Sequence, residues 1–575
     1  METFQAQLAG KLADALSSAG FAPAGEVTPA TDRRFGDYQS NAAMVLAKQR
    51  GENPRKIADA IIDRLDVSEI SEPANVAGAG FINFTIKGEA VEKKIAELLC
   101  DERLGVTLSS SPKKIVIDFG SPNVAKPMHV GHIRSTFLGD ALARIAEFLG
   151  HDVIRDNHIG DWGTQFGMVI WGWKNLLDLE ALKRDPIAEL VRIYKETNER
   201  GTKDEAIREA VRGELVKLQA GDPENFSIWK KCVDLSIQEF SRAYELLDIR
   251  YDIVRGESFY NDRLPAVVDR LLKSGLAEIS EGAVCVFFRD IPDLADKPCI
   301  IRKRDGGYNY ATTDVATVDY RIKELNRDTV WIVTGAPQQL HFRQIFEIAK
   351  REGYRADFRH IPNGNILGPD RKLMKTRSGE NVPLAELLEE AMARAEKIIA
   401  EKNPHLSGPD RKHIAKIIGI GAIKYADLSQ YRMTDYVFSF DRMLSLQGNT
   451  APYLQNAYVR IRSIFRKAAP GGTALTELPI SVDQLILAEP AELGLAKKLC
   501  QFAEIVPQVL QDFRPNILAN YLFELANSFH TFYEACPVLK ADEPTRSARL
   551  ALCTLTGRIL RRGLKLLGID VPERM

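Results

Sequence analysis

The chain has 575 residues, of which 45% are hydrophobic and 27% are charged, and its formal net charge is −1. A single core rarely organises so many residues, so we expect about three to five domains. No stretch approaches the roughly 18 to 20 uninterrupted apolar residues that a membrane span requires. The seven cysteines include no C-x-x-C pair, which disfavours a disulfide framework or a structural zinc site. The composition predicts a soluble cytoplasmic protein without its own metal site, and any nucleic-acid-binding surface must be local.

Residues 1–108 are predicted to form a small α+β domain. An apolar residue recurs every fourth position over 4–16, which indicates an amphipathic helix and no basic export leader. The segment NPRKIADAIIDRL predicts a second helix, and FINFTI (81–86) alternates like a strand. The loop RRFGDYQSN (33–41) lies between these patterns and interrupts both.

Residues 109–370 are predicted to form a Rossmann-like catalytic domain. The run KIVIDFG resembles a parallel strand buried on both faces. A loop, a helix from HVGH to FLG and the strand DVIRDNH follow, which makes one βαβ unit with the usual right-handed crossover. Residues from about 171 to 300 are charged and helix-rich, and we interpret them as a helical insertion. The second half of the domain begins at YNYATTDVATVDYRI and contains the strand TVWIVTG (329–335).

The remaining chain is predicted to contain a basic loop and many helices. The glycine-rich loop NILGPDRKLMKTRSGE (365–380) leads into connecting helices over 371–445, and residues 446–575 form an all-α domain. Two basic faces occur in that domain, at NAYVRIRSIFRKA and at GRILRRGLKLLG. A solvated helix face and an RNA-binding face remain equally open as interpretations.

Two histidines mark the start of the helix that follows the first buried strand. His129 and His132 are three residues apart and share a face, and Gly131 leaves room for a flat adenine beside the backbone. A helix N-terminus has unpaired N–H groups and a positive dipole end, so it attracts phosphate. Two histidines can also bind a metal, but no third ligand is obvious nearby. The arrangement predicts a nucleoside triphosphate cradle directed at the α-phosphate.

The stretch from SPNVAKPMHVGHIR to DWGTQFG (121–167) resembles the first active-site motif of arginyl-tRNA synthetases, class I enzymes with the signature H-I-G-H; here valine replaces isoleucine. FGDYQSNAAMVLAK resembles the family's N-terminal domain, and YATTD, QQLHF and GNTAPYLQNAYVRI resemble later segments. FHTFYEACPVL and GLKLLGIDVPERM resemble its helical anticodon-binding domain. The resemblance covers nearly the whole chain.

This resemblance implies an arginine–tRNA ligase. ATP would activate L-arginine to arginyl-adenylate and pyrophosphate, and arginine would then pass to the 2′-hydroxyl of the terminal adenosine of its tRNA. The alternatives are another class I aminoacyl-tRNA synthetase and a non-catalytic RNA-binding relative. A dinucleotide oxidoreductase is excluded because no G-x-G-x-x-G follows the first strand.

The resemblance also implies an arginine site. A planar guanidinium with five donors requires carboxylate acceptors in fixed positions, and Asp118 and Asp314 supply two. Asp118 is a departure, since a longer acid often stands there in the family. The residues assigned to arginine are Asp118, Ser121 and Asn123, with Asn123 and His129 near its backbone end, and Tyr310, Asp314 and Gln338 near its side chain.

The second class I signature, K-M-S-K, is degenerate in LMKTRSG. Met374 matches, but Lys375 stands at the serine position and Thr376 at the second lysine, with Arg377 next. Because one active-site cation is missing, Lys126 on the first loop is the natural substitute. The predicted ATP site comprises His129, Gly131, His132, Lys126, Met374 and Lys375, and Lys375 and Arg377 steady the pyrophosphate. Mg²⁺ is expected to arrive with ATP.

Three further surfaces are predicted to contact tRNA, and the chain is expected to act as a monomer. Stacking of bases on an aromatic such as Tyr458 would suit a single-stranded anticodon. Gln165 lies in a segment that either lines the site near the tRNA 3′ end or forms a structural turn. The predicted contacts are Phe35, Asp37, Gln39 and Asn41 in the N-terminal domain, Gln165, and then Tyr458, Arg462, Arg558, Arg561 and Arg562 in the C-terminal domain.

Overall fold

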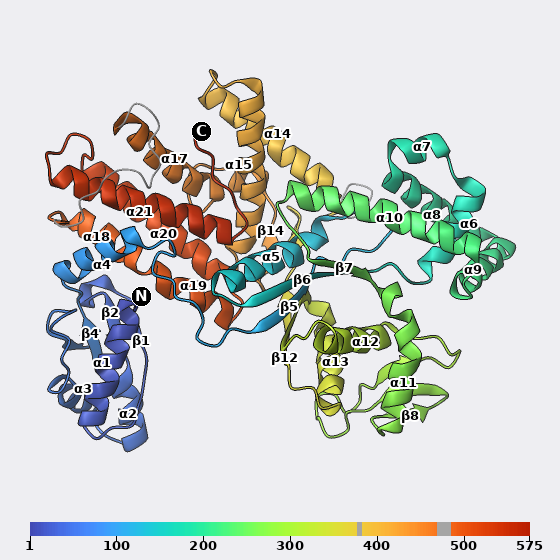
Figure 1. Cartoon of the computed structure of the whole chain (residues 1–575), viewed down its shortest axis with the longest axis horizontal. Coiled ribbons are helices and arrows are strands. Elements are labelled where there is room, and N and C mark those ends of the chain that lie inside the picture. Colours follow the sequence, from blue (N-terminus) through green and yellow to red (C-terminus); the bar gives the residue numbers. More distant parts are fainter. Residues whose placement is uncertain (376–381, 469–484) are drawn as a thin grey trace. The chain divides into compact units, whose positions relative to one another are not determined.

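The computed structural model describes residues 1–375, 382–468 and 485–575 (Figure 1). Its contacts group the chain into two compact units. The first contains Met1–Leu108, Ser445–Lys565 and Asp570–Met575, and the second contains Ser109–Leu444 and Leu566–Ile569. None of the described helices is both long and apolar enough to cross a membrane.

The N-terminal part of the first unit has the predicted α+β character. The predicted first helix is confirmed, because its apolar residues at every fourth position are buried and Thr3 accepts a backbone N–H at its start. Four short strands form an antiparallel sheet in the order β1-β2-β4-β3. The elements are α1 (Phe4–Ser18), β1 (Val27–Pro29), η1 (Arg33–Phe35), β2 (Tyr38–Ser40), α2 (Ala42–Arg50), α3 (Pro54–Ile62), β3 (Asn75–Ala77), β4 (Phe81–Phe84) and α4 (Gly88–Cys100).

The described C-terminal part of the first unit consists of long helices, as predicted. They bury leucine, alanine and phenylalanine side chains against one another, so packing of apolar faces holds this part together. The helices are α17 (Ala451–Ala468), α18 (Pro490–Cys500), α19 (Phe502–Gln511), α20 (Pro515–Ala535) and α21 (Thr545–Leu566).

A five-stranded parallel sheet forms the centre of the second unit, which confirms the Rossmann-like prediction. Its order is β12-β11-β5-β6-β7. The chain runs from β5 through β6 to β7 in one direction and later adds β11 and β12 on the other side. The carboxyl ends of β5 and β11 therefore flank the topological switch point, where α/β sheets bind ligands. The strands are β5 (Lys114–Phe119), β6 (Asp152–Ile159), β7 (Ile253–Gly256), β11 (Thr329–Gly335) and β12 (Asp357–Asn363).

Helices of the second unit pack against the central sheet. Gly139 allows α5 to approach β5 closely, since a Cβ there would lie 2.2 Å from Phe119 Cγ. The associated elements are η2 (Val130–His132), α5 (Ile133–Phe148), α12 (Tyr310–Lys323), η4 (Ala336–Gln338), α13 (Gln339–Arg351), β13 (Ile366–Leu367), α14 (Leu384–Lys402), α15 (Gly408–Leu428), β14 (Tyr436–Val437) and α16 (Phe440–Met443).

The predicted helical insertion over about 171–300 needs correction beyond residue 246. Five helices occupy its first part, but β7 then joins the central sheet, and β8 to β10 form a separate antiparallel sheet. Strands of four residues show too little alternation to separate them from helix ends in the sequence. The elements are α6 (Gln165–Leu176), α7 (Leu179–Arg184), α8 (Pro186–Lys203), α9 (Glu205–Gln219), α10 (Pro223–Leu246), η3 (Glu257–Arg263), α11 (Leu264–Lys273), β8 (Ala277–Ser280), β9 (Ala283–Val286) and β10 (Cys299–Arg302).

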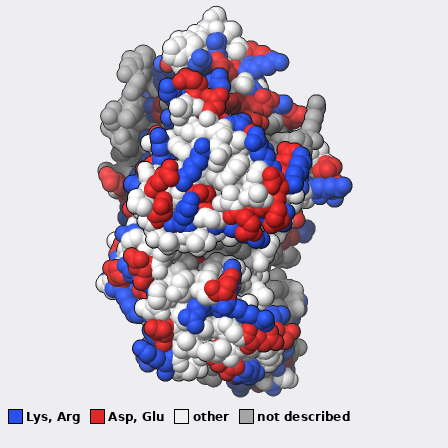
Figure 2. All heavy atoms as spheres, turned by 90° about the vertical axis from the view of Figure 1, so that its right-hand side faces the viewer, with Lys and Arg blue, Asp and Glu red and all other residues white. Residues whose placement is uncertain are grey.

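The charged helices of this insertion carry ion pairs along their own surfaces. Arg200 pairs with Glu196, and Lys203 pairs with Glu199, each four residues apart on α8. On the face that Figure 2 shows, acidic and basic side chains are interspersed. The high charge content of this part therefore reflects solvated helix faces.

Candidate active site

The two histidines of HVGH hold each other and the turn before α5. The backbone N–H of His129 donates to His132 Nδ1 at 3.1 Å, and the N–H of Gly131 donates to His129 Nδ1 at 3.1 Å. Because both Nδ1 atoms accept, we assign the ring protons to Nε2. Burial lowers the pKa of His132 to about 4, and burial together with Lys126 lowers the pKa of His129. Both rings are therefore neutral near pH 7 and carry an Nε2–H donor.

Gly131 is required by the position of the His129 ring. A Cβ on this glycine would lie 2.8 Å from His129 Cε1 and 2.9 Å from Nδ1, too close for any side chain. Gly131 itself is exposed. The glycine therefore allows the imidazole to fold over the turn, a reason that the sequence alone did not suggest.

The loop between β5 and η2 is held in an unusual backbone conformation. Ser121 and Ala125 have φ of 45° and 59°, the left-handed region that non-glycine residues rarely adopt. Asn123 forms a parallel bridge with Gly160 at the end of β6, and the Ala125 N–H donates to Ser236 Oγ on α10 at 3.1 Å. Such strain persists where surrounding contacts fix it, often at functional sites. These contacts thereby hold the exposed side chain of Asn123 in the crevice at the carboxyl ends of β5 and β11.

The described residues that follow the degenerate second signature pair with the histidine turn. The backbone of residues 382–384 pairs with residues 128–130 through hydrogen bonds of 2.9 Å at both ends. Before the loop, the Met374 N–H donates to Ile366 O at 3.2 Å, and Lys375 is exposed. Arg377 lies outside the described residues. The chain that carries Lys375 therefore returns to the protein beside the nucleotide cradle.

Lys126 lies between the histidines and the helical insertion. Its ammonium is 5.7 Å from the centre of the Tyr194 ring on α8. Its charge also contributes to the lowered pKa of His129. An exposed cation with a weak aromatic contact can move toward an incoming phosphate at little cost.

A buried guanidinium connects α12 to the carboxyl end of β5 and to the middle of β6. Arg321 donates to Asp118 Oδ2 at 2.5 Å and, through Nε, to Asp156 Oδ2 at 3.0 Å, and all three side chains are buried. Asp118 also accepts a hydrogen bond from Ser121 Oγ at 2.9 Å. The prediction that Asp118 binds the substrate guanidinium directly therefore needs correction, since an internal arginine already occupies that carboxylate. Asp118 instead anchors the loop that carries Ser121.

Three carboxylates gather at the other end of α12. Burial, together with the nearby charges of Asp314 and Asp161, raises the pKa of Glu257 to about 8. Asp161 is fixed by Ser258, whose backbone N–H and hydroxyl donate to it at 2.8 and 2.6 Å. Like charges this close require a cation or a proton to relieve their repulsion. The cluster is therefore suited to a guanidinium.

The predicted side-chain readers lie in the first two turns of α12 and at the end of η4. Asp314 Oδ2 is 2.6 Å from His341 Nε2, and the His341 ring lies 4.8 Å from that of Tyr310, which is 60% exposed. Gln338 is exposed at the end of η4, directly after β11. Tyr310, Asp314 and Arg321 share one face of α12 because they are spaced by four and seven residues. At 1.5 Å per residue, Asp314 lies about 10 Å along the helix from Arg321.

Sequence reasoning missed Glu257, His341, Arg321 and Asp156. Glu257 follows β7, which the prediction had placed inside the helical insertion. Arg321 could have been found by extending the Tyr310–Asp314 spacing by two more turns of the same helix. Asp156 ends up opposite Asp118 because β5 and β6 pair in register.

The predicted tRNA contacts in the N-terminal part differ in their exposure. Phe35 is 49% exposed, and Asn41 is also exposed, although its Oδ1 accepts the Glu26 N–H at 3.2 Å. Gln39 lies on β2 and is half-buried. Asp37 is engaged within the unit, because its Oδ2 accepts from the Ile86 N–H and from Lys497 Nζ at 2.8 and 2.6 Å. Of these four residues, Phe35 and Asn41 are therefore the two that are exposed to a binding partner.

The predicted C-terminal contacts need a larger correction. Tyr458 is 0% exposed and donates to Glu573, so base stacking on its ring is wrong for this structure. Arg462 pairs with the same Glu573 at 2.5 Å. Arg558 donates to the carbonyls of residues 98, 99 and 101 at the C-terminal end of α4, so it holds this end of the helix in place.

Two predicted residues on α21 and one on α6 remain at the surface. Arg561 and Arg562 are exposed. Helical periodicity assigned them to the same face as Arg558, but of these three residues only Arg558 is partly buried in the unit. In the second unit, Gln165 is half-buried at the first position of α6, and its side chain lies against Gly163.

Removing the Arg321 guanidinium tests the role of the buried bridge. Arg321→Met leaves Asp118 and Asp156 without a counter-charge, so we expect a loss of about 3–5 kcal/mol in unfolding free energy at pH 8. Burial already raises the pKa of Asp156, and the variant removes the opposing charge of Arg321, so protonation of Asp156 on folding reduces the loss as the pH falls toward 5.5. Urea denaturation at both pH values measures this. Arg343→Met, at an exposed pair with Asp293, is the control and should cost under about 1 kcal/mol. An equal loss for Arg321→Met at both pH values would contradict the interpretation.

Family models match three consecutive parts of the chain. The model described as tRNA synthetases class I (R), catalytic domain, matches residues 94–440. The Arginyl tRNA synthetase N terminal domain matches 4–86, and the DALR anticodon binding domain matches 454–575.

Whole-length relatives and solved structures agree with these models. The chain is 45% identical over 590 residues to the arginine–tRNA ligase of Synechococcus elongatus and 46% identical over 587 residues to that of Thermobifida fusca, with 99% of each chain covered. Over the full length of both chains, the arginyl-tRNA synthetase of Plasmodium falciparum has a TM-score of 0.86 at 31% identity, and that of Thermus thermophilus 0.84 at 27%. The chain belongs to the arginyl-tRNA synthetase family.

Proposed function

We propose that this member of the arginine–tRNA ligase family activates L-arginine with ATP in the crevice at the carboxyl ends of β5 and β11. The arginine carboxylate attacks the α-phosphate and releases pyrophosphate. The arginyl group of the adenylate then passes to the 2′-hydroxyl of the terminal adenosine of the tRNA. No protein nucleophile is needed, because positioning and preorganised hydrogen-bond donors carry the reaction.

The observation that carries this proposal is the group of carboxylates around Glu257. A guanidinium placed between Glu257 and Asp314 offers several N–H donors to two acceptors and relieves the repulsion that raises the pKa of Glu257. Tyr310 and Gln338 border the same region, and His341 orients Asp314. At the backbone end of the substrate, Ser121 and Asn123 occupy the strained loop, with His129 next to it.

The proposed ATP site uses the neutral histidines and nearby cations. The Nε2–H groups of His129 and His132 meet charge that develops on the α-phosphate, and the exposed Gly131 borders the adenine. Lys126 takes the place of the lysine that K-M-S-K lacks here. Lys375 and Arg377 act on the leaving pyrophosphate, with Met374 at the start of their loop.

Several other parts of the account are also proposals. Mg²⁺ enters with the nucleotide and neutralises triphosphate charge; the described residues contain no group of three or more His, Cys, Asp or Glu side chains placed to hold a metal ion. The protein acts as a cytoplasmic monomer with four domains, divided at about 108, 370 and 445. For tRNA we retain Phe35, Gln39, Asn41, Gln165, Arg561 and Arg562.

A different amino acid substrate is the main alternative within the class. An acidic substrate would add a fourth negative charge beside Glu257, Asp314 and Asp161, so the electrostatics of the crevice disfavour it.

A non-catalytic relative is the second alternative. The degenerate K-M-S-K loop favours a non-catalytic relative, whereas the ordered HVGH turn favours catalysis. Adenylate formation distinguishes these two possibilities.

Glu257→Gln tests the guanidinium site. Because substrate binding requires the ionised carboxylate, kcat/KM for arginine should rise about tenfold between pH 7 and pH 9 in the wild type, around a pKa of about 8. The variant should lose about 10²-fold in kcat/KM, roughly 2.7 kcal/mol, and lose that pH dependence. Steady-state aminoacylation with fixed ATP and tRNA measures both. Glu324→Gln, at an exposed ion pair with Arg263, is the control. A variant that keeps the wild-type pH profile would reject this role.

His132→Asn tests the proposed phosphate donor. Asparagine Oδ1 can replace Nδ1 as the acceptor for the His129 N–H, but the variant has no group at the Nε2 position. We expect kcat to fall about 10²–10³-fold, as when one oxyanion donor is removed, with the KM for arginine nearly unchanged. Pyrophosphate release and the melting temperature separate catalysis from folding. Loss of kcat together with a large drop in melting temperature would indicate a structural role instead.

A further inference from the structure

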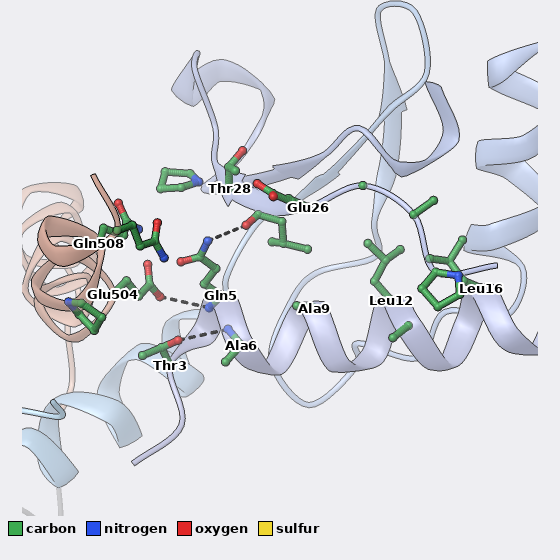
Figure 3. Close-up of a pocket in the computed structure, with 18 residues that line it drawn as sticks. Thr3, Gln5, Ala6, Ala9, Leu12, Leu16, Glu26, Thr28, Glu504 and Gln508 are labelled. Atoms are coloured by element: carbon green, nitrogen blue, oxygen red, sulfur yellow. Dashed lines mark hydrogen bonds between the residues drawn. The ribbon is translucent and has the colours of Figure 1, made fainter. Parts of the chain in front are cut away.

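The first unit contains a second cavity, remote in sequence from the residues of the crevice. It has a volume of about 680 Å³, within the range of small-molecule sites. Figure 3 shows α1 along one side, the segment around Glu26 and Thr28 opposite, and Glu504 and Gln508 of α19 at one end. Alanine and leucine side chains of α1 line its wall.

The charge of the cavity lining has one sign. Of the eighteen described residues that line it, two are acidic, Glu26 and Glu504, and none is lysine, arginine or histidine. Gln5, Gln508 and Gln511 add amide groups that can accept hydrogen bonds. This lining repels phosphate and carboxylate groups, so an RNA backbone does not fit it. It suits a ligand with an apolar body and a cationic end.

Glu504 is a buried carboxylate whose hydrogen bonds come from neutral groups. It is 6% exposed, and its oxygens accept hydrogen bonds from the Gln5 N–H at 3.1 Å and from the Tyr38 hydroxyl at 2.9 and 3.1 Å. No ion pair joins it to a basic side chain in the described part of the chain. Lys498, whose charge lowers the pKa of Glu504, pairs with Glu524. In Figure 3 its carboxylate lies between Gln5 and Gln508 at the end of the cavity.

From this cavity we infer a binding site for a small organic amine, with its ammonium group on Glu504 and its apolar part along Ala6, Ala9 and Leu12 of α1. A charge-assisted hydrogen bond in a buried setting is about twice as strong as a neutral one. The amide oxygens of Gln5 and Gln508 can accept the remaining ammonium protons. The site is separate from the proposed arginine site, which lies in the other unit.

The pH dependence of this site is set by Glu504. Burial raises the pKa of Glu504 to about 7. Of the groups around it, burial and the charge of Glu504 raise the pKa values of Tyr38 on β2, Tyr521 on α20 and Cys500 on α18 above their usual ranges. Lys498 and Glu524 pair with each other. Amine binding requires the ionised carboxylate, so affinity should increase about tenfold from pH 6 to pH 8.

The test uses 4-fluorophenethylamine and the full-length protein. Fluorine NMR line broadening, with L-arginine at saturating concentration to fill the active site, should show saturable binding of the amine. The matched probe 4-fluorophenylacetate, with the same ring and a negative charge, should not bind. Equal binding of the two probes, or displacement of the amine as L-arginine is raised, would overturn the proposal.

Three variants separate the site from a general effect on the fold. Glu504→Gln keeps an acceptor for Tyr38 and should weaken amine binding at least tenfold at pH 8 and remove its pH dependence. Ala9→Trp fills the cavity from an exposed position of α1 and should abolish binding even if Glu504→Gln folds poorly. Glu89→Gln, an exposed carboxylate in the same unit, should bind like the wild type. Wild-type affinity in Ala9→Trp would show that the amine binds elsewhere.

Discussion

The catalytic unit depends on one buried interaction, the bridge from Arg321 to Asp118 and Asp156. It joins the carboxyl end of β5 and the adjacent parallel strand β6 to the last turn of α12. Because helices are rigid at this length, fixing Arg321 also fixes Asp314 two turns away, and so sets the separation between the two ends of the amino acid site. Asp118 also accepts a hydrogen bond from Ser121 Oγ, which helps to fix the strained loop before the histidines. Because burying two charges costs desolvation energy, a buried ion pair often adds little net stability to the folded protein. We therefore propose that this bridge serves mainly to fix the relative positions of α12, β5 and β6.

Electrostatics divide the crevice into two regions with different tasks. Near β5, one guanidinium largely compensates the carboxylates, and neutral imidazoles offer N–H donors to a phosphate. Near β7, three carboxylates lie together without such compensation, and the raised pKa of Glu257 records the cost. A substrate with a guanidinium at one end and a carboxylate to be activated at the other fits this order. We therefore propose that these carboxylates select the amino acid by its positive charge.

The sequence was most informative where periodicity was long or a motif was local. The α1 helix, the βαβ unit and the helical C-terminal domain follow from apolar spacing, and HVGH could be placed at a helix start. It was least informative where a side chain's partner is remote in sequence. Asp118 and Arg321 are 203 residues apart, so nothing local showed that this acid was already paired. Likewise Tyr458 and Arg558 look like parts of a basic aromatic surface, but both face the interior of their unit. The four-residue strand β7, which directly precedes Glu257, could not be recognised because the sequence around it is charged and helix-rich.

We propose that the carboxylates around Glu257 select the amino acid by its charge. Citrulline has nearly the shape of arginine but a neutral urea in place of the guanidinium, so it isolates that property. The most direct measurement is aminoacylation of total tRNA with arginine and with citrulline, compared by kcat/KM. The account predicts a preference for arginine of about 10⁴-fold or more. Charging of citrulline within tenfold of arginine, or a failure to charge arginine, would contradict it.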